Sequence, residues 1–179
     1  MSCDAAELRE RASRIRLILF DVDGVLTDGD IILNADGSES KRFSIRDGTG
    51  IVWAHRAGLK TGVLSGRSSA ATALRAAQLG MAVIRQDVSA KQDVYAEIRR
   101  QCGLTDAEVA YMGDDVMDLP VLRQAGLSAA PADAAEQVRR RVHWVSSAAG
   151  GRGAARELVE LVLDAQGLLK QIVAAYAGE

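Results

Sequence analysis

Short apolar runs alternate with helical patterns along most of this chain, and this alternation restricts the possible folds more than any other feature. A continuous apolar run of three to five residues, closed by glycine or polar residues, is typical of a strand buried on both faces. Helical segments between such strands favour a parallel sheet covered by helices. The sequence therefore predicts an α/β fold, a Rossmann-like parallel sheet with helices on both faces. The expected strands are residues 17–20, 61–64, 82–84, 109–112, 126–129 and 142–145.

The segments between these runs carry helix signals, with one exception. Helices are expected over residues 48–57, 68–79, 89–101 (capped by Ser89), 116–124 and 134–141, and in a tail broken near Gly167. The exception is a β-hairpin at about residues 30–45, whose strands 31–33 and 39–45 flank an Asp-Gly turn. Such a hairpin is marginal alone and needs a surface to pack against. We expect one domain over residues 1–179, with a C-terminal tail at about 150–179.

Composition excludes several classes of function. The net charge is −2 over 179 residues, and nucleic-acid binding usually needs a concentrated basic face. The chain has no apolar run near the roughly 18 residues that span a bilayer, and residues 1–7 lack the apolar stretch of a signal peptide. Cys3 and Cys102 lack the spacing of metal ligands, which favours reduced thiols. We therefore expect a cytoplasmic protein that binds neither nucleic acid nor membrane.

Two carboxylates, Asp21 and Asp23, follow directly on the first expected strand. Ligands of open α/β sheets bind at the carboxyl ends of the strands, and side chains two residues apart on a strand point the same way. Two such acids repel each other unless a cation or a proton intervenes, which suits a nucleophilic carboxylate beside a general acid/base. The alternative is a turn in which Asp21 is only a capping residue. Thr27 could donate hydrogen bonds to the acids.

Two further groups could hold a phosphate. Ser65 and Gly66 follow the second strand and precede a helix, so hydroxyl, flexible backbone and helix N-terminus form a possible phosphate cradle. Lys91 lies in the first turn of a helix, where a cation opposes the helix dipole and a bound anion would remove the conflict. An ordinary turn and an ordinary surface lysine are the alternatives.

A last acidic group, at residues 113–118, follows the fourth strand. Clustered carboxylates at a sheet edge suit Mg²⁺, which binds one or two carboxylates, water and a substrate phosphate. Asp114 is the expected ligand, and Asp115 and Asp118 would support it, although these acids could instead cap the next helix. All these groups follow strands of one parallel sheet, so they should meet at one edge. The sequence predicts a Mg²⁺-dependent phosphatase in which Asp21 attacks phosphorus and Asp23 handles the protons.

These motifs resemble the haloacid dehalogenase superfamily of phosphohydrolases. The pattern Asp-x-Asp-Gly-x-x-Thr-Asp, Ser-Gly-Arg, lysine and Gly-Asp-Asp-x-x-Asp carries the resemblance, which covers about residues 15–165. It implies that Asp21 is the nucleophile, Asp23 the acid/base, and Ser65 and Lys91 phosphoryl contacts. It also implies a metal site built from Asp21, the Val22 carbonyl, Asp23 and Asp114. The spacing between the motifs leaves no room for a cap domain.

Within the superfamily, the chain is similar to the phosphatases of 3-deoxy-D-manno-octulosonate 8-phosphate (KDO 8-phosphate), which serve lipopolysaccharide synthesis. Matching stretches are residues 21–29, 43–51, 113–115 and 150–157. The resemblance implies a homotetramer in which a neighbour's hairpin and tail replace the cap. Expected substrate contacts are Thr27, Asp47, Gly66, Arg67, Arg152 and Arg156. Phosphatases of nine-carbon keto sugar acids, a phosphomutase, a binding module for acidic sugars and a noncatalytic oligomerisation module remain the alternatives.

Overall fold

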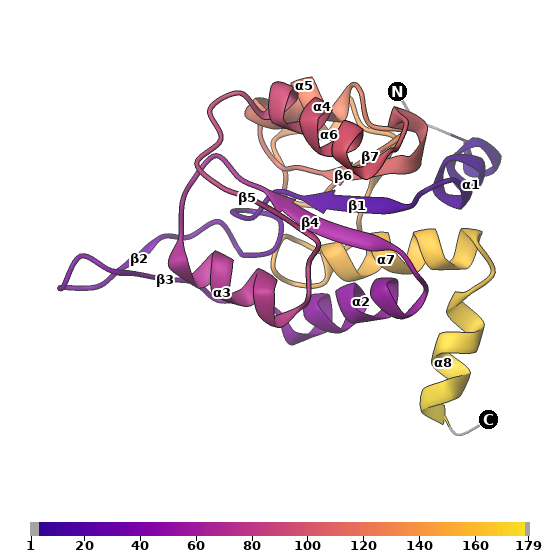
Figure 1. The fold of residues 1–179 in the computed structure, drawn as a ribbon, viewed down its shortest axis with the longest axis horizontal. Helices are drawn as coiled ribbons and strands as arrows, with labels where there is room; N and C mark the ends of the chain where they lie inside the picture. The colour runs from indigo at the N-terminus through magenta and orange to yellow at the C-terminus, as the bar shows by residue number, and fades with distance from the viewer. Residues whose placement is uncertain (1–3, 178–179) are drawn as a thin grey trace.

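A computed structural model describes residues 4–177 and shows a single parallel sheet between two layers of helices (Figure 1). The six strands lie in the order β5-β4-β1-β6-β7-β8. Their bounds are β1 Leu17–Phe20, β4 Lys60–Leu64, β5 Val83–Arg85, β6 Val109–Met112, β7 Leu127–Ala130 and β8 Trp144–Val145. The predicted α/β class and parallel sheet are confirmed.

The helices divide between the two faces of this sheet. On one face lie α2 (Ile45–Arg56), α3 (Ala70–Gln78) and α7 (Ala154–Ala165); on the other lie α4 (Lys91–Cys102), α5 (Leu119–Leu122) and α6 (Glu136–Arg139) (Figure 1). Two short 3₁₀ helices, η1 (Asp106–Glu108) and η2 (Val116–Asp118), precede and follow β6. Each face has its own hydrophobic core, because side chains of a strand alternate between the faces. In β1, Ile18 and Phe20 belong to one core and Leu17 and Leu19 to the other.

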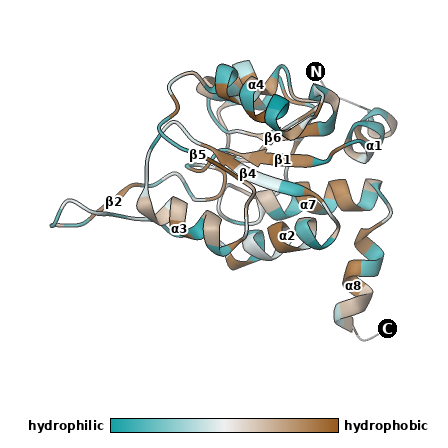
Figure 2. Cartoon of the chain, viewed as in Figure 1, coloured by the Kyte–Doolittle hydropathy of each residue, from teal (hydrophilic) through white to brown (hydrophobic). Residues whose placement is uncertain are grey.

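All four residues of β1 are buried, and the strand lies between β4 and β6 in the sheet. Leu17 is paired with Lys60 on one side and with Val109 on the other, so the three strands end at the same level. Figure 2 shows β1 in the brown of apolar residues, between helices that carry both polar and apolar residues. The central strands therefore bring the residues that follow them to one edge.

The hairpin is shorter than predicted. Its strands are β2 (Ile32–Leu33) and β3 (Glu39–Ser40), and it projects from the body of the molecule (Figure 1). Residues 41–44 are not a strand, and Ile45 begins α2 because the Ser44 hydroxyl accepts a hydrogen bond from the Asp47 N–H. The prediction of a strand through residue 45 was therefore wrong, since the capping serine was read as part of an alternating strand.

One other prediction about helices needs correction, and one helix was not predicted. Ser89 does not cap α4; Ala90 occupies that position and makes no side-chain capping bond. A helix α1 (Ala5–Ser13), capped by Asp4, was not predicted. The break in the tail is confirmed: Gly167 has φ +74° between α7 and α8 (Leu169–Ala177).

Between β1 and β4 the structure holds only the hairpin and α2, and between α4 and β6 only η1. Within residues 4–177 there is thus no cap domain, as predicted from the spacing. No helix in the same range is both long and apolar enough to cross a membrane. Cys102 is a free thiol, whereas Cys3 lies outside the described residues.

Candidate active site

The residues that follow β1, β4 and β6 meet in one cleft of about 300 Å³ at the carboxyl edge of the sheet. Its lining includes Asp21, Asp23, Ser65, Gly66, Arg67, Lys91, Asp114, Asp115 and Asp118. The parallel register explains this convergence, because the Asp21 N–H continues the ladder to the Met112 carbonyl just before the cleft begins. The sequence prediction that these side chains lie together is confirmed.

Lys91 bridges two carboxylates at the centre of the cleft. Its Nζ lies 3.0 Å from Oδ1 of Asp21 and 2.7 Å from Oδ1 of Asp118. The lysine side chain is 7% exposed, so it is largely removed from water. Burial alone would lower the pKa of the Lys91 ammonium, but the carboxylates of Asp21 and Asp118 raise it above its usual value. Lys91 is therefore a fixed positive charge beside the first carboxylate.

Asp118 is a structural support for this site. Its Oδ1 accepts hydrogen bonds from Lys91 and from the Tyr111 hydroxyl at 2.5 Å, and its Oδ2 accepts the N–H groups of Asp114 and Asp115 at 3.1 and 3.3 Å. With both oxygens engaged, Asp118 holds Lys91 and the following turn in place. Asp115 differs from this pattern: it is exposed, and its side chain accepts from the Val116 N–H at the start of η2.

The acids at this edge form a group that suits a cation. Oxygen atoms of Asp21, Asp114 and Asp118 all lie within 4.8 Å of one another. Burial and the neighbouring carboxylates raise the pKa of Asp21 to about 6 and that of Asp114 to about 7. A divalent cation between Asp21 and Asp114 would relieve this repulsion, and hard carboxylate oxygens are ligands that Mg²⁺ accepts. The donor set therefore fits Mg²⁺, with Asp21 and Asp114 as the ligands.

Gly24 lets the loop after β1 approach these acids. It has φ +80°, and a Cβ atom at this position would lie 2.0 Å from Oδ2 of Asp114. Any other residue would therefore clash with the carboxylate in addition to straining the backbone.

Asp23 has different neighbours from Asp21. It forms ion pairs with Lys41 and, at 3.5 Å, with Nε of Arg67. Arg67 also donates to Glu39 of β3 at 2.7 Å. The Asp23 carboxylate thus faces the base of the hairpin and is not part of the acidic group formed by the described residues. Its predicted role as a carboxylate ligand of the metal is not supported by this orientation.

Two more predictions concerning the loop after β1 were wrong. The Val22 carbonyl accepts the N–H groups of Val25, Leu26 and Thr27, so its oxygen points into the turn and cannot reach a metal. The Thr27 hydroxyl is 3.4 Å from that carbonyl and accepts from the Gly29 N–H. Thr27 therefore stabilises the turn and donates to neither acid.

The predicted phosphate cradle lies beside the acids. Ser65 is buried, and its hydroxyl accepts the Arg67 N–H at 3.2 Å. Gly66 has its Cα close to the Lys91 side chain, since a Cβ there would lie 4.0 Å from Cε. Hydroxyl, glycine backbone and ammonium group thus share one side of the cleft.

Three predicted substrate contacts lie elsewhere. Asp47 is buried and accepts the N–H groups of Gly153 and Arg156 at the start of α7. The Arg156 guanidinium stacks 3.7 Å from the ring centre of Trp53 and is paired with Glu160. Within one chain, both residues join α2 to α7, because Asp47 caps the start of α7 and Arg156 packs on Trp53 of α2. Arg152 is exposed and lines a different cleft with Asp28, Arg42 and Arg46.

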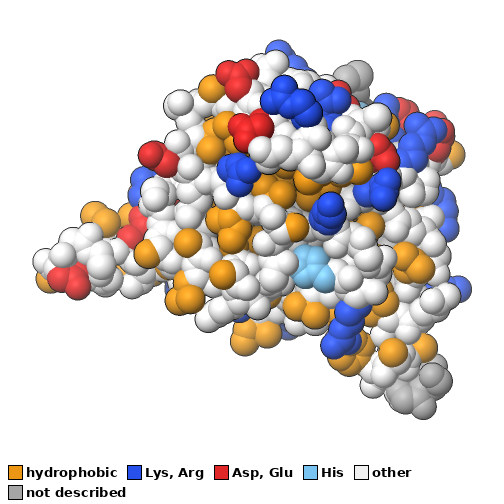
Figure 3. Space-filling model, viewed as in Figure 1, with side chains coloured by type: hydrophobic (Ala, Val, Ile, Leu, Met, Phe, Trp, Pro, Cys, Tyr) orange, Lys and Arg blue, Asp and Glu red, His pale blue; other side chains and the backbone are white. Residues whose placement is uncertain are grey.

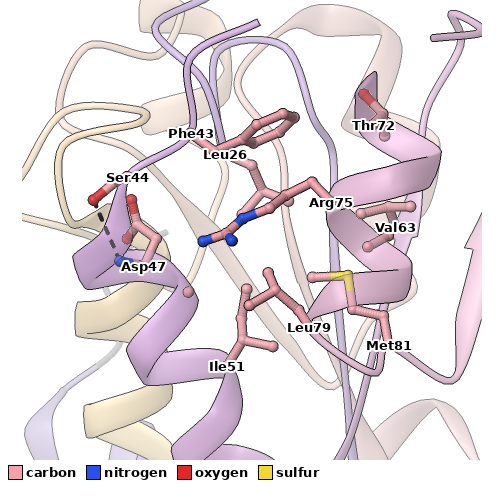
Figure 4. A pocket seen from close by; sticks show the side chains of 12 residues that line it. Leu26, Phe43, Ser44, Asp47, Ile51, Val63, Thr72, Arg75, Leu79 and Met81 are labelled. Carbon is pink, nitrogen blue, oxygen red and sulfur yellow. Dashed lines mark hydrogen bonds between the residues drawn. The ribbon is translucent and has the colours of Figure 1, made fainter. Parts of the chain in front are cut away.

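Asp47 also lines a small apolar cavity between α2 and α3 (Figure 4). Arg75 reaches across it from α3 towards α2, beneath Phe43. Among the described residues, this cavity and the acidic cleft have no lining residue in common. The cavity is therefore a gap in the helix packing and no part of the cleft.

Sequence reasoning missed three residues that contact the side chains lining the cleft. Tyr111 was read as an apolar strand residue, although a buried tyrosine hydroxyl usually needs a partner, and that need was the available signal. Lys41 and Glu39 lie in or next to the hairpin and belong to no recognised motif. Nothing in their local pattern shows that they turn back towards Asp23.

Comparisons with known proteins agree with this geometry. A family model described as haloacid dehalogenase-like hydrolase matches residues 49–126. The 3-deoxy-D-manno-octulosonate 8-phosphate phosphatase KdsC of Escherichia coli (strain B / BL21-DE3) is 39% identical over 167 residues, which are 93% of this chain and 89% of the relative.

Two solved structures share the whole fold. A probable YrbI family phosphatase from Pseudomonas syringae pv. phaseolica 1448a superposes with a TM-score of 0.95 at 43% identity, covering 97% of this chain and 98% of the other. The 3-deoxy-D-manno-octulosonate 8-phosphate phosphatase of Moraxella catarrhalis, in complex with a magnesium ion, a phosphate ion and a KDO molecule, superposes with a TM-score of 0.94 at 35% identity. That match covers 97% of this chain and 99% of the other.

Proposed function

Because this chain belongs to the haloacid dehalogenase-like hydrolases, in the family of the 3-deoxy-D-manno-octulosonate 8-phosphate phosphatases, we propose that it hydrolyses KDO 8-phosphate to KDO and phosphate. It is then a phosphoric monoester hydrolase that uses Mg²⁺ and acts in the synthesis of a lipopolysaccharide precursor. The observation that carries the proposal is the buried contact between Lys91 and Asp21 beside Asp114. It combines a nucleophile, a fixed cation and a metal ligand at one sheet edge.

The reaction follows from these neighbours. Mg²⁺ held by Asp21 and Asp114 would offset the negative charge of the phosphoryl group. Lys91 and Ser65 bind the remaining phosphoryl oxygens, and one oxygen of Asp21 attacks phosphorus. As the new bond from Asp21 to phosphorus forms, the bond from phosphorus to the sugar oxygen breaks, and Asp23 donates a proton to that oxygen.

The second half of the reaction uses the same groups. Asp23 accepts a proton from water as the water oxygen attacks the phosphorus of the aspartyl phosphate. The bond to Asp21 then breaks, which releases phosphate, returns Asp21 to its carboxylate form and leaves Asp23 protonated, as it was before the first step. Asp118 and Tyr111 take no part in the bond changes, because their contacts only fix Lys91 and the metal-binding turn.

The proposal is tested by assaying phosphate release from a panel of sugar phosphates, with and without Mg²⁺. KDO 8-phosphate should have the highest kcat/KM, above nine-carbon keto sugar acid phosphates and above sugar phosphates that lack a carboxylate. A higher kcat/KM for a nine-carbon substrate would favour the related phosphatase, and no release from any ester would favour the noncatalytic module. The intact Asp21, Asp23, Lys91 and Asp114 support an active enzyme.

We also propose a homotetramer in the cytoplasm. Ile31, Ile32 and Leu33 of the projecting hairpin are exposed. Figure 3 shows apolar side chains on the surface of the part that projects from the body of the molecule. Such a patch favours burial against another subunit. In that assembly Arg152 could read a substrate carboxylate in a neighbouring site, as Arg67 could in its own.

A further inference from the structure

A lysine at the base of the hairpin contacts the second carboxylate of the active site. Lys41 follows β3 directly and forms an ion pair with Asp23. Its side chain is 1% exposed, whereas Arg42, the next residue, is exposed and pairs with Asp28. A buried ammonium loses its hydration and persists only where carboxylates replace the water. The burial of the Lys41 side chain therefore indicates that its ion pair with Asp23 is a fixed contact of the site.

The other contacts of this group show what Lys41 contributes. The Lys41 Nζ also lies 3.4 Å from Oε1 of Glu39, and this oxygen atom has no hydrogen-bond partner. Arg67 is the second cation near Asp23, but its Nε is 3.5 Å away and its Nη2 donates to Glu39 at 2.7 Å. Lys41 thus makes the close contact on Oδ1 of Asp23, and Arg67 makes a distant one on Oδ2.

Asp23 shares its cleft with the carboxylates of Asp21 and Asp114, and a phosphate dianion must enter the same space. All these anions repel the ionised form of Asp23, which is the form that accepts the proton from water. Without Lys41, the carboxylate would turn towards Arg67, at the solvent-exposed side of the cleft. Lys41 opposes this rotation because it holds Oδ1 from the buried side.

We propose that Lys41 is a positioning residue that holds Asp23 in line for its proton transfers to the sugar oxygen and from water. The proposal rests on the proposed function, in which Asp23 is the acid/base. It adds a residue of the hairpin to the reaction and gives the hairpin a task within its own chain.

The leaving group separates this role from a merely structural one. An alkyl alcohol leaves as a poor anion and needs a proton from Asp23, whereas p-nitrophenolate leaves without one. The ratio kcat/KM reports only the steps up to the release of the leaving group. A misplaced Asp23 should therefore lower kcat/KM for an alkyl phosphate and spare p-nitrophenyl phosphate. Glycerol 1-phosphate is a suitable alkyl substrate, because it has no carboxylate that Lys41 could bind.

The experiment compares Lys41→Met with the wild type on glycerol 1-phosphate, KDO 8-phosphate and p-nitrophenyl phosphate, with Mg²⁺ present. We expect kcat/KM for both alkyl phosphates to fall by roughly tenfold to a hundredfold, as a small displacement of a catalytic group can cause. For p-nitrophenyl phosphate the fall should be less than about threefold. Lys60→Met, an exposed lysine at the opposite end of the sheet, is the matched control and should change none of the three.

A double-mutant cycle tests whether Lys41 acts through Asp23. In an Asp23→Asn background, Lys41→Met should lower kcat/KM for KDO 8-phosphate no further, because the group it positions is already disabled. Equal losses on alkyl and aryl substrates, or additive losses in the cycle, would overturn the proposal. If Lys41→Met melts below the assay temperature, Lys41→Arg serves instead, and the same selective loss should appear at a smaller size.

The outcomes also separate this proposal from the proposed function. A wild-type protein that hydrolyses none of the three esters would refute the function itself. An active wild type whose Lys41→Met variant keeps the wild-type ratio of alkyl to aryl hydrolysis would refute only the role of Lys41.

Discussion

Two regions of the candidate active site, the sheet edge and the base of the hairpin, each contain a lysine that lies between two carboxylates. The two regions differ in the secondary structure that holds these residues. At the sheet edge, Lys91 bridges Asp21 and Asp118, which are 12% and 1% exposed. At the base of the hairpin, Lys41 bridges Asp23 and Glu39, which are 21% and 15% exposed. The first network is built on strand ends and a helix start, whereas the second depends on a segment without regular structure.

This difference indicates that the sheet edge and the base of the hairpin have different roles in the reaction. In the proposed reaction, the sheet fixes the groups that touch phosphorus, which must hold their positions closely in every turnover. In the same proposal, the hairpin base positions Asp23, the group that transfers protons. Changes at the sheet edge should therefore abolish the chemistry, and changes at the hairpin base should alter selectivity.

The largest effect is expected from Asp21→Asn. An amide cannot form the phosphoenzyme, so kcat should fall by on the order of a thousandfold or more for every substrate. Because the substitution removes a buried charge from a repelling group, the fold should survive. Steady-state phosphate release and circular dichroism check the two points. Asp93→Asn, an exposed acid in the first turn of α4, should retain full activity.

Removal of Mg²⁺ should have the second-largest effect on activity. Burial and the neighbouring carboxylates, Asp118 in both cases, raise the pKa values of Asp21 and Asp114 and so disfavour their charged forms. A bound cation would reverse this. We expect activity to vanish after dialysis against a chelator and to return with Mg²⁺. The melting temperature should also rise with added Mg²⁺, because the ion binds the folded state. Full activity in chelator would contradict the assignment of Asp21 and Asp114 as ligands.

The two lysines should differ in what they contribute to stability. Without Mg²⁺, Lys91→Met leaves Asp118 and Asp21 buried without their cation, and we expect a loss of about 3 kcal/mol in unfolding free energy. Lys41→Met leaves Asp23 and Glu39 still facing the guanidinium of Arg67, so the loss should be smaller, about 1 kcal/mol. Urea denaturation measures both. A larger loss of unfolding free energy for Lys41→Met than for Lys91→Met would show that the base of the hairpin contributes more to stability than the sheet edge does.

A smaller, substrate-dependent effect is expected from Arg67→Ala. This guanidinium is half exposed and lines the cleft, so a sugar carboxylate that enters from solvent can pair with it. KM for KDO 8-phosphate should rise by roughly tenfold, the size of one charged hydrogen bond, while p-nitrophenyl phosphate is unaffected. Equal effects on both substrates would place Arg67 in phosphoryl binding instead.

The smallest effect on folding is expected at the hairpin tip. Leu33 is 74% exposed, so Leu33→Ser should change the unfolding free energy of the subunit by less than about 0.5 kcal/mol. If hairpins pack together in a tetramer, the same change should shift the assembly towards smaller species in light scattering. A fully active wild-type monomer at assay concentrations would refute the shared-site proposal.

The sheet-edge half of the site could be predicted from sequence because its geometry follows from topology. Asp21, Ser65 and Asp114 each follow an apolar strand, and parallel strands must end at one edge. Lys91 was placed correctly for the same reason, although the cap assigned to its helix was wrong. Tyr111 was missed because periodicity treats a buried tyrosine as apolar.

The hairpin half could not be predicted, because no regular element sets the path of residues 41–44. Lys41 and Asp23 meet only after the chain has left the sheet and returned to it. Asp47 and Arg156 are the opposite case. Both lie in stretches that match the family, yet within the chain their contacts are a helix cap and a stacking contact on Trp53. Similarity to a family motif marks a residue as constrained without saying whether substrate or packing constrains it.

Asp21 at the sheet edge carries the phosphoryl group in the proposed reaction, and chemical trapping detects that intermediate itself. The protein is mixed with KDO 8-phosphate and Mg²⁺, quenched within one turnover and treated with borohydride, which reduces an acyl phosphate to an alcohol. Peptide mass spectrometry should then find homoserine at position 21 in the wild type and none in Asp21→Asn. Homoserine at any other aspartate, or steady turnover with none at position 21, would show that Asp21 is not the nucleophile.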